Sequence, residues 1–155
     1  MSGLFDPQAF LDQATTDAGS TESTPIPAGE YLAIIKDVKP RQWAKKDDPS
    51  ITGVAFDIAY LIEDDNLKTL LERKEVKITQ GIMMDMTEDG RIDYGKGKNI
   101  TWNRLRDSAN MNQPGRPFAP SHLLGQFVKI MVGHRLDNNS TPPTVRVDVK
   151  GTARP

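Results

Sequence analysis

Hydrophobic and polar residues alternate along five stretches of this chain. Alternation with a period of two is typical of β-strands that bury one face and expose the other. The last stretch shows it most clearly, because three valines at every second position are separated by charged residues, and we expect those valines to point inward. The pattern predicts strands at about residues 30–40, 53–63, 75–86, 126–136 and 144–153.

One long stretch has helical periodicity instead. Residues 99–110 place Trp102, Leu105 and Ala109 on one side of a helix, and Asn99 stands at its start as a plausible N-cap. An aromatic residue at helical spacing among apolar neighbours usually belongs to the core, so we expect Trp102 to be buried. A shorter segment, residues 66–73, also has helical character and lengthens the connection between the second and third strands.

The order of these elements is informative. Three strands, one helix and two further strands follow one another, as in a five-stranded OB barrel whose helix lies between strands 3 and 4. We therefore predict a mainly β fold, a five-stranded OB-like antiparallel barrel formed by residues 28–155. Such barrels bind oligonucleotides or oligosaccharides on the face of strands 2 and 3 and in the loops between strands 1–2 and 4–5.

The first 27 residues differ from the rest and predict an extended N-terminal arm. Asp6 and Pro7 are typical of the start of a short helix, and Phe5 and Phe10 could pack together across that start. Residues 15–27 are rich in Thr, Ser, Ala, Gly and Pro, which is typical of a linker. The arm could contact a second subunit or replication proteins, or it could lie on its own domain.

Charge is distributed unevenly although the 155 residues sum to a net charge of −1. Residues 1–28 carry four acidic residues and no Lys or Arg, whereas residues 91–155 carry eleven Lys or Arg against four Asp or Glu. A basic C-terminal half suits a polyanionic partner, although surface charges also serve simply to solvate a protein.

Composition narrows the possible classes of function. The chain has no cysteine, which excludes disulfides and thiolate chemistry, and it has no apolar run of membrane-spanning length. The N-terminal residues lack the basic and apolar regions of a signal peptide, so we expect a cytoplasmic protein that does not enter a membrane.

No motif predicts catalysis, a cofactor or a metal. The segment 90–97 resembles a P-loop but ends in Gly97 where Ser or Thr would hold magnesium, and the segment 85–96 resembles a calcium loop but ends in Lys96 instead of Glu. His122 and His134 fall on different predicted elements and have no metal-binding spacing. We therefore expect a protein that is not an enzyme.

Basic and aromatic residues in and around the connections are the remaining candidates. Trp43 lies in the polar loop that we expect between strands 1 and 2, flanked by four cations. This suits a platform for base stacking, although the ring could instead cap the end of the barrel. Tyr94 begins a Gly- and Lys-rich segment before the helix, which suits a phosphate or a solvated turn. The predicted nucleic-acid-binding residues are Arg41, Trp43, Lys45, Lys46, Lys77, Tyr94, Lys96, Lys98, Lys129 and Arg135.

Short segments of the chain resemble a bacteriophage family of small replication-module proteins. These segments are Asn103–Arg106, Ser121–Val132, Val147–Thr152 and the predicted opening strand Ile26–Val38. Members of that family are described as OB-fold single-stranded DNA-binding proteins. The resemblance covers residues 26–153 and implies the same fold and ligand here. One departure is that the chain ends in Ala153-Arg154-Pro155, with no acidic tip of the kind that recruits replication partners.

Together these features predict a phage protein of DNA replication or recombination, located in the host cytoplasm. It would coat single-stranded DNA without catalysis and with weak sequence dependence, and it could form homo-oligomers through its arm. Two alternatives stay open at this point: a structural or assembly module that uses the same barrel to bind proteins, and a barrel that binds carbohydrate or peptide. RNA would suit the same residues as DNA.

Overall fold

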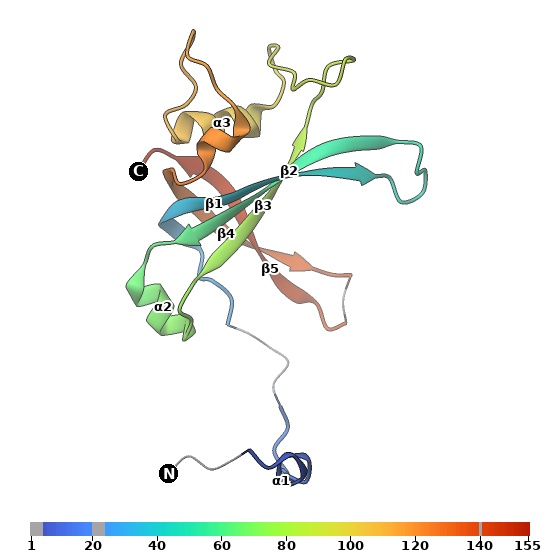
Figure 1. Ribbon diagram of the computed structural model, residues 1–155, viewed down its shortest axis with the longest axis vertical. Helices are drawn as coiled ribbons and strands as arrows, with labels where there is room; N and C mark the ends of the chain where they lie inside the picture. Colours follow the sequence, from blue (N-terminus) through green and yellow to red (C-terminus); the bar gives the residue numbers. More distant parts are fainter. Residues whose placement is uncertain (1–4, 20–23, 140) are drawn as a thin grey trace.

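The protein is built around one five-stranded antiparallel sheet. The computed structural model describes residues 5–19, 24–139 and 141–155 (Figure 1). Glu22, one of the four acidic residues of the arm, lies outside the described residues. The strands are β1 (Gly29–Ala44), β2 (Thr52–Ile62), β3 (Lys77–Met84), β4 (Phe127–Asp137) and β5 (Thr144–Ala153).

The predicted mainly β fold with five antiparallel strands is confirmed. The spatial order of the strands is β3-β2-β1-β4-β5, and every neighbouring pair is antiparallel. The sheet curves so that its two outer strands, β3 and β5, approach each other, which gives a barrel-like shape. It is not closed, because β3 and β5 are not paired by a hydrogen-bonded ladder.

Helices are few and short. They are α1 (Pro7–Leu11), α2 (Asp65–Leu71), α3 (Ile100–Ser108) and a 3₁₀ turn, η1 (Pro120–Leu123). The connection between β3 and β4 therefore holds η1 as well as the one helix predicted from the sequence. Helix α3 packs against β3 and β5, at one end of the gap between them. No helix in the described part of the chain is long and apolar enough to cross a membrane.

The core lies on the concave side of the sheet, and most of its residues are those that the alternating pattern predicts. Trp102 is fully buried, as expected, and its indole stacks on Phe56 with 4.6 Å between ring centroids. Ile26, which precedes β1, also lies in this core, and its carbonyl oxygen is 2.7 Å from His134 Nε2. The fully buried β-strand residues include Ile35, Ile58, Tyr60, Val128 and Ile130.

Two strands depart from simple alternation. In β1 the pairing register shifts between Ile35 and Asp37, a β-bulge, so Ile35 and Val38 both pack against the core although they are three residues apart. In β5 the prediction that all three valines point into the core is wrong for Val145, which is 52% exposed. This valine lies beside the turn of the β4–β5 hairpin, where it lines an open hollow together with Arg73 and residues 77–79.

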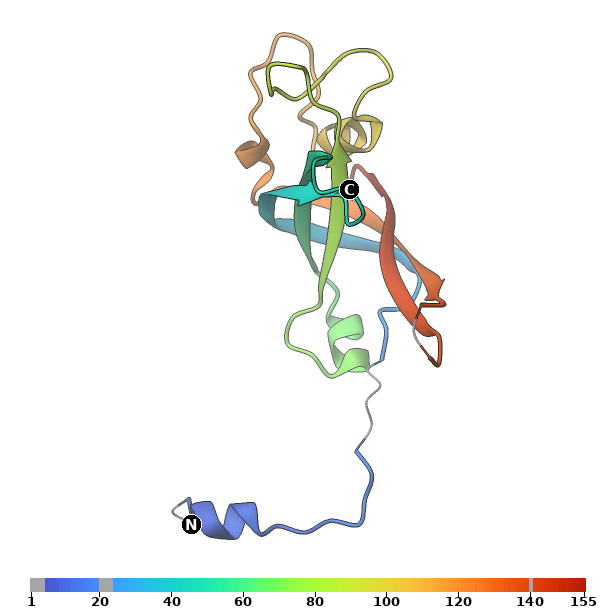
Figure 2. The ribbon, with the colours of Figure 1, turned by 90° about the vertical axis from the view of Figure 1, so that its right-hand side faces the viewer.

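The N-terminal arm contains the short helix that the sequence predicts. Asp6 caps α1, because its Oδ1 accepts hydrogen bonds from the backbone N–H groups of Gln8 and Ala9. The rings of Phe5 and Phe10 lie 5.4 Å apart, which confirms the predicted packing across the helix start. Figure 2 shows α1 well apart from the sheet.

Candidate nucleic-acid interface

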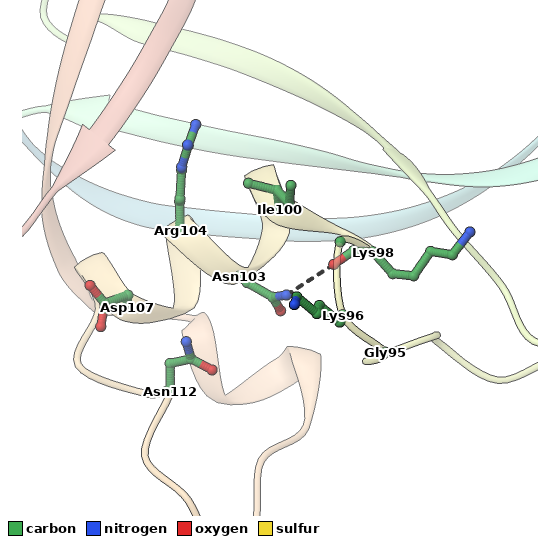
Figure 3. Close-up of a pocket in the computed structure, with 9 residues that line it drawn as sticks. Gly95, Lys96, Lys98, Ile100, Asn103, Arg104, Asp107 and Asn112 are labelled. Atoms are coloured by element: carbon green, nitrogen blue, oxygen red, sulfur yellow. Dashed lines mark hydrogen bonds between the residues drawn. The ribbon is translucent and has the colours of Figure 1, made fainter.

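A groove runs beside the start of α3. It consists of two adjoining hollows of about 390 and 420 Å³ that share Gly97 and Ile100 in their walls. The first hollow is bounded by the Gly- and Lys-rich segment and by α3, as Figure 3 shows. The second extends to the end of β3, where Gly81 and Met83 form its wall. The residues of the first hollow are Gly95, Lys96, Gly97, Lys98, Ile100, Asn103, Arg104, Asp107 and Asn112.

Three cations in the wall of this groove lack an acidic partner. Among the described residues, no carboxylate lies within 4.0 Å of the charged nitrogens of Lys96, Lys98 or Arg104. Two carboxylates line the groove: Asp107 pairs with Arg154 at 3.1 Å, and Asp85 accepts a hydrogen bond from the backbone N–H of Asn99 at 3.0 Å. Lys98 and Arg104 point away from each other, so the cations are spread along the groove and do not converge on one point (Figure 3).

Asn99 anchors the segment that carries the groove lysines. Its side chain accepts a hydrogen bond from the backbone N–H of Asp85 (2.7 Å) and donates to the carbonyl oxygens of Asp85 and Asp93 (2.8 Å each). The expected N-cap position is confirmed, but the side chain does not cap the helix. It pins both ends of the loop 85–98 together, because its buried amide serves as a partner for three backbone groups.

Tyr94 is held in place by its neighbours. Its hydroxyl oxygen accepts a hydrogen bond from Trp102 Nε1 at 3.3 Å, and the guanidinium of Arg106 lies 5.0 Å from its ring centroid. The same guanidinium lies 4.1 Å from the ring of Phe118. Tyr94 remains 50% exposed, so its ring can still be contacted from solvent. A cation between two aromatic rings stiffens this side of the loop.

Trp43 lies on a strand and not in a loop, because β1 extends to Ala44. It is paired with Gly53 of β2, and its indole lies directly over that glycine: a Cβ at position 53 would be 2.3 Å from Trp43 Cζ2. The ring is therefore half-buried against the outer face of the sheet and does not cap the barrel end. Lys45 and Lys46 follow it in the exposed turn of the β1–β2 hairpin, without a carboxylate within 4.0 Å in the described part of the chain.

The outer face of β1, β2 and β3 connects the hairpin with the groove. Trp43 and Gly53 form one cross-strand row, and Arg41, Ala55 and Met83 form the next. Rows on one face of a sheet are about 7 Å apart along the strands. Met83 is 60% exposed and also lines the groove, so a continuous surface leads from Trp43 to the cations at α3.

Arg41, a predicted phosphate contact, forms an ion pair with a carboxylate. Its Nε and a terminal nitrogen donate to the two carboxylate oxygens of Asp57 at 2.9 and 3.3 Å. This hydrogen bonding, together with the negative charge of Asp57, raises the pKa of the Arg41 guanidinium. The pair neutralises the centre of the outer face, which separates the cations of the hairpin from those of the groove.

The other three predicted cations lie away from the groove. Lys77 begins β3, at the end of the strand opposite Met83. Lys129 lies on β4, where it is paired with Leu32 of β1. Arg135 lies on the β4–β5 hairpin, and its Nε is 3.0 Å from Asp148 Oδ2. This interaction and the charge of Lys150 both lower the pKa of the Asp148 carboxyl. The structure thus brings together only part of the predicted set.

Sequence reasoning missed several groove residues. Arg104 had a visible signal, since it falls outside the buried stripe of its helix and so must face solvent. Met83 and Asn103 had none, because an exposed methionine on a strand and an amide on a helix are ordinary in sequence. In the comparisons with known proteins, neither the family models nor the curated proteins give a match to this chain.

Proposed function

We propose that this protein binds single-stranded DNA through the groove at α3 and the outer face that leads to Trp43. The single observation that carries the proposal is the set of three groove cations without carboxylate partners, Lys96, Lys98 and Arg104. A polyanion would supply the missing negative charge, and neutralising phosphates releases counterions from the nucleic acid.

The fold is consistent with this ligand. We propose that the open sheet is an OB barrel, because its strand order and the place of α3 between β3 and β4 match that fold. The groove and Trp43 both adjoin the face of strands 2 and 3, on which such barrels bind oligonucleotides. The resemblance to phage replication-module proteins supports the same assignment.

The arrangement favours contact with many phosphates and few bases. The groove cations are spread along a surface, whereas Trp43 and Tyr94 are the aromatic rings along it that a base can reach. Stacking on such rings tolerates any base, because every base presents a flat aromatic face. We therefore propose weakly sequence-dependent, non-catalytic binding, in which the protein covers a strand that is about to be copied or recombined.

Titrations of the whole protein against a labelled dT oligonucleotide, in a series of salt concentrations, test this proposal. Fluorescence anisotropy should report binding to the single strand that is tighter than binding to a matched duplex and that weakens steeply as salt rises. A neutral oligosaccharide should not compete. The absence of binding at low salt, or binding that ignores salt, would overturn the proposal.

A further inference from the structure

Helix α1 presents apolar side chains that nothing in its own arm covers. Phe5, Phe10 and Leu11 are 71%, 60% and 76% exposed, and no residue of α1 is buried. A helix of five residues is too short to be stable alone in water, so tertiary contact is needed to hold it. The exposed apolar tip therefore indicates a docking element.

A matching surface lies on the outside of β1 and β4. Leu32 and Ile34 face outward there, because the residues that alternate with them, Ala33 and Ile35, point into the core. Phe127 is the direct cross-strand partner of Ile34 and is 48% exposed. Leu124, 46% exposed, adjoins them, because the next residue, Gly125, donates its backbone N–H to the Ile35 carbonyl. We call this surface, formed by Leu32, Ile34, Leu124 and Phe127, the β1–β4 patch.

Charges of both signs border the patch, with Glu30 two residues before Leu32, and the cation among them, Lys129, complements the acidic arm. The described arm residues 5–19 carry Asp6, Asp12 and Asp17 and no Lys or Arg. Lys129 borders the patch and has no carboxylate within 4.0 Å among the described residues. Glu63 also borders the patch, through the hydrogen bond of its backbone N–H to the Leu32 carbonyl, but its carboxylate is 4.0 Å from Lys68.

We propose that α1 of one molecule docks on the β1–β4 patch of a second copy of this chain. In the structure the arm extends away from its own sheet (Figures 1 and 2), which leaves both surfaces of each molecule available to neighbours. Residues 12–25 could span roughly 45 Å if extended, which is enough to reach a second molecule. Each copy contributes one arm and one patch, so the contact can close as a reciprocal dimer or continue head-to-tail from molecule to molecule.

Sedimentation of the full chain, without nucleic acid, tests this inference independently of the proposed function. The average mass should rise with protein concentration. The rise should be lost in the double variant Phe5→Ala/Phe10→Ala and in Leu124→Ser/Phe127→Ser. Leu70→Ser, which removes an equally exposed apolar side chain from α2, is the control and should associate as the unmodified protein does.

Mixing the two deficient variants gives the decisive result. The arm variant keeps an intact patch, and the patch variant keeps an intact arm. One molecule of each can therefore pair, but neither can bind a third, so association should return and stop at dimers. A monomer at all concentrations, or association that persists in both variants, would overturn the proposal. Docking of the arm on its own domain would appear as a monomer and would equally contradict it.

Discussion

Individual side chains decide which of the basic and aromatic residues can meet a ligand. Arg41 and Arg135 are typical nucleic-acid contacts by type, yet each is bound to a carboxylate across the strands. Lys98 has no such partner and remains available. Residue type and position in the chain can predict a cation, but they cannot show whether a distant Asp on the next strand neutralises it.

Trp43 is the residue for which stacking makes the clearest prediction. Trp43→Ala should weaken binding to a dT oligonucleotide by about 1 kcal/mol, or roughly fivefold, because one ring face already lies over Gly53 and only the rest can meet a base. Ile51→Ala, which removes an exposed apolar side chain from the same turn, is the control in the anisotropy titration. Equal affinities for the two variants would exclude stacking on Trp43.

A second variant tests the position of the ring without removing it. Gly53→Ala should also weaken binding, since the new methyl group would occupy the space of the indole and displace it. The fluorescence of Trp43 should change at the same time. An unchanged spectrum would show that the ring does not lie over position 53.

Asn99 should matter for stability more than its small side chain indicates. Asn99→Ala removes the side-chain partner of the Asp85 N–H and of the Asp93 carbonyl, while the Asp85 carbonyl keeps the Asp93 N–H. The free energy of unfolding should therefore fall by about 2–4 kcal/mol. Urea denaturation measures this change, with the exposed Asn112→Ala as a control expected to stay within about 0.5 kcal/mol. A loss no larger than that of the control would mean that the loop 85–98 is held by other contacts.

The elements themselves were largely predictable, and the departures have physical causes. Period-two alternation located all five strands, because each buries one face against a single core. The register shift in β1 was not visible in the sequence, because apolar residues stand both before and after the inserted residue. The continuation of β1 to Ala44 was also missed, because exposed hairpin strands need no alternation when neither face is buried.

The β4–β5 hairpin gives a prediction about pH. The pKa of Asp148 should lie below the ordinary value of an aspartate, because the hydrogen bond from Arg135 and the charges of Arg135 and Lys150 favour its charged form. Its folded pKa is therefore lower than its unfolded pKa, so its contribution to stability is present above the unfolded pKa and is lost as the pH falls through the folded one. NMR titration of the Asp148 carboxyl should show an increased pKa in Arg135→Ala.

The same variant distinguishes a structural role from a binding role for Arg135. Arg135→Ala should leave the affinity for a dT oligonucleotide within about twofold, since this guanidinium is already bound to Asp148 and lies outside the groove. Lys98→Ala should weaken binding more. A larger loss for Arg135→Ala would place the β4–β5 hairpin in the interface.

At the scale of the whole molecule, part of the basic excess of the C-terminal half gathers in the wall of the groove at α3. The basic excess of residues 91–155 predicted a polyanion partner but could not locate it, because contacts between distant strands select which cations stay unpaired. The ten predicted residues therefore divide. Seven lie on the continuous surface or beside it: Trp43, Lys45, Lys46, Tyr94, Lys96, Lys98 and Arg41, of which Arg41 is paired with Asp57. Lys77, Lys129 and Arg135 do not.

The most direct test of the account compares two triple variants that remove the same charge. One, Lys96→Ala/Lys98→Ala/Arg104→Ala, empties the groove of cations, and the other, Lys77→Ala/Lys129→Ala/Arg135→Ala, removes cations elsewhere. Each phosphate contact contributes about 0.7 to the slope of log affinity against log salt for single strands. The groove variant should make that slope shallower by about 2, while the other variant should keep the slope of the unmodified protein. Equal changes in both variants would contradict binding at the groove.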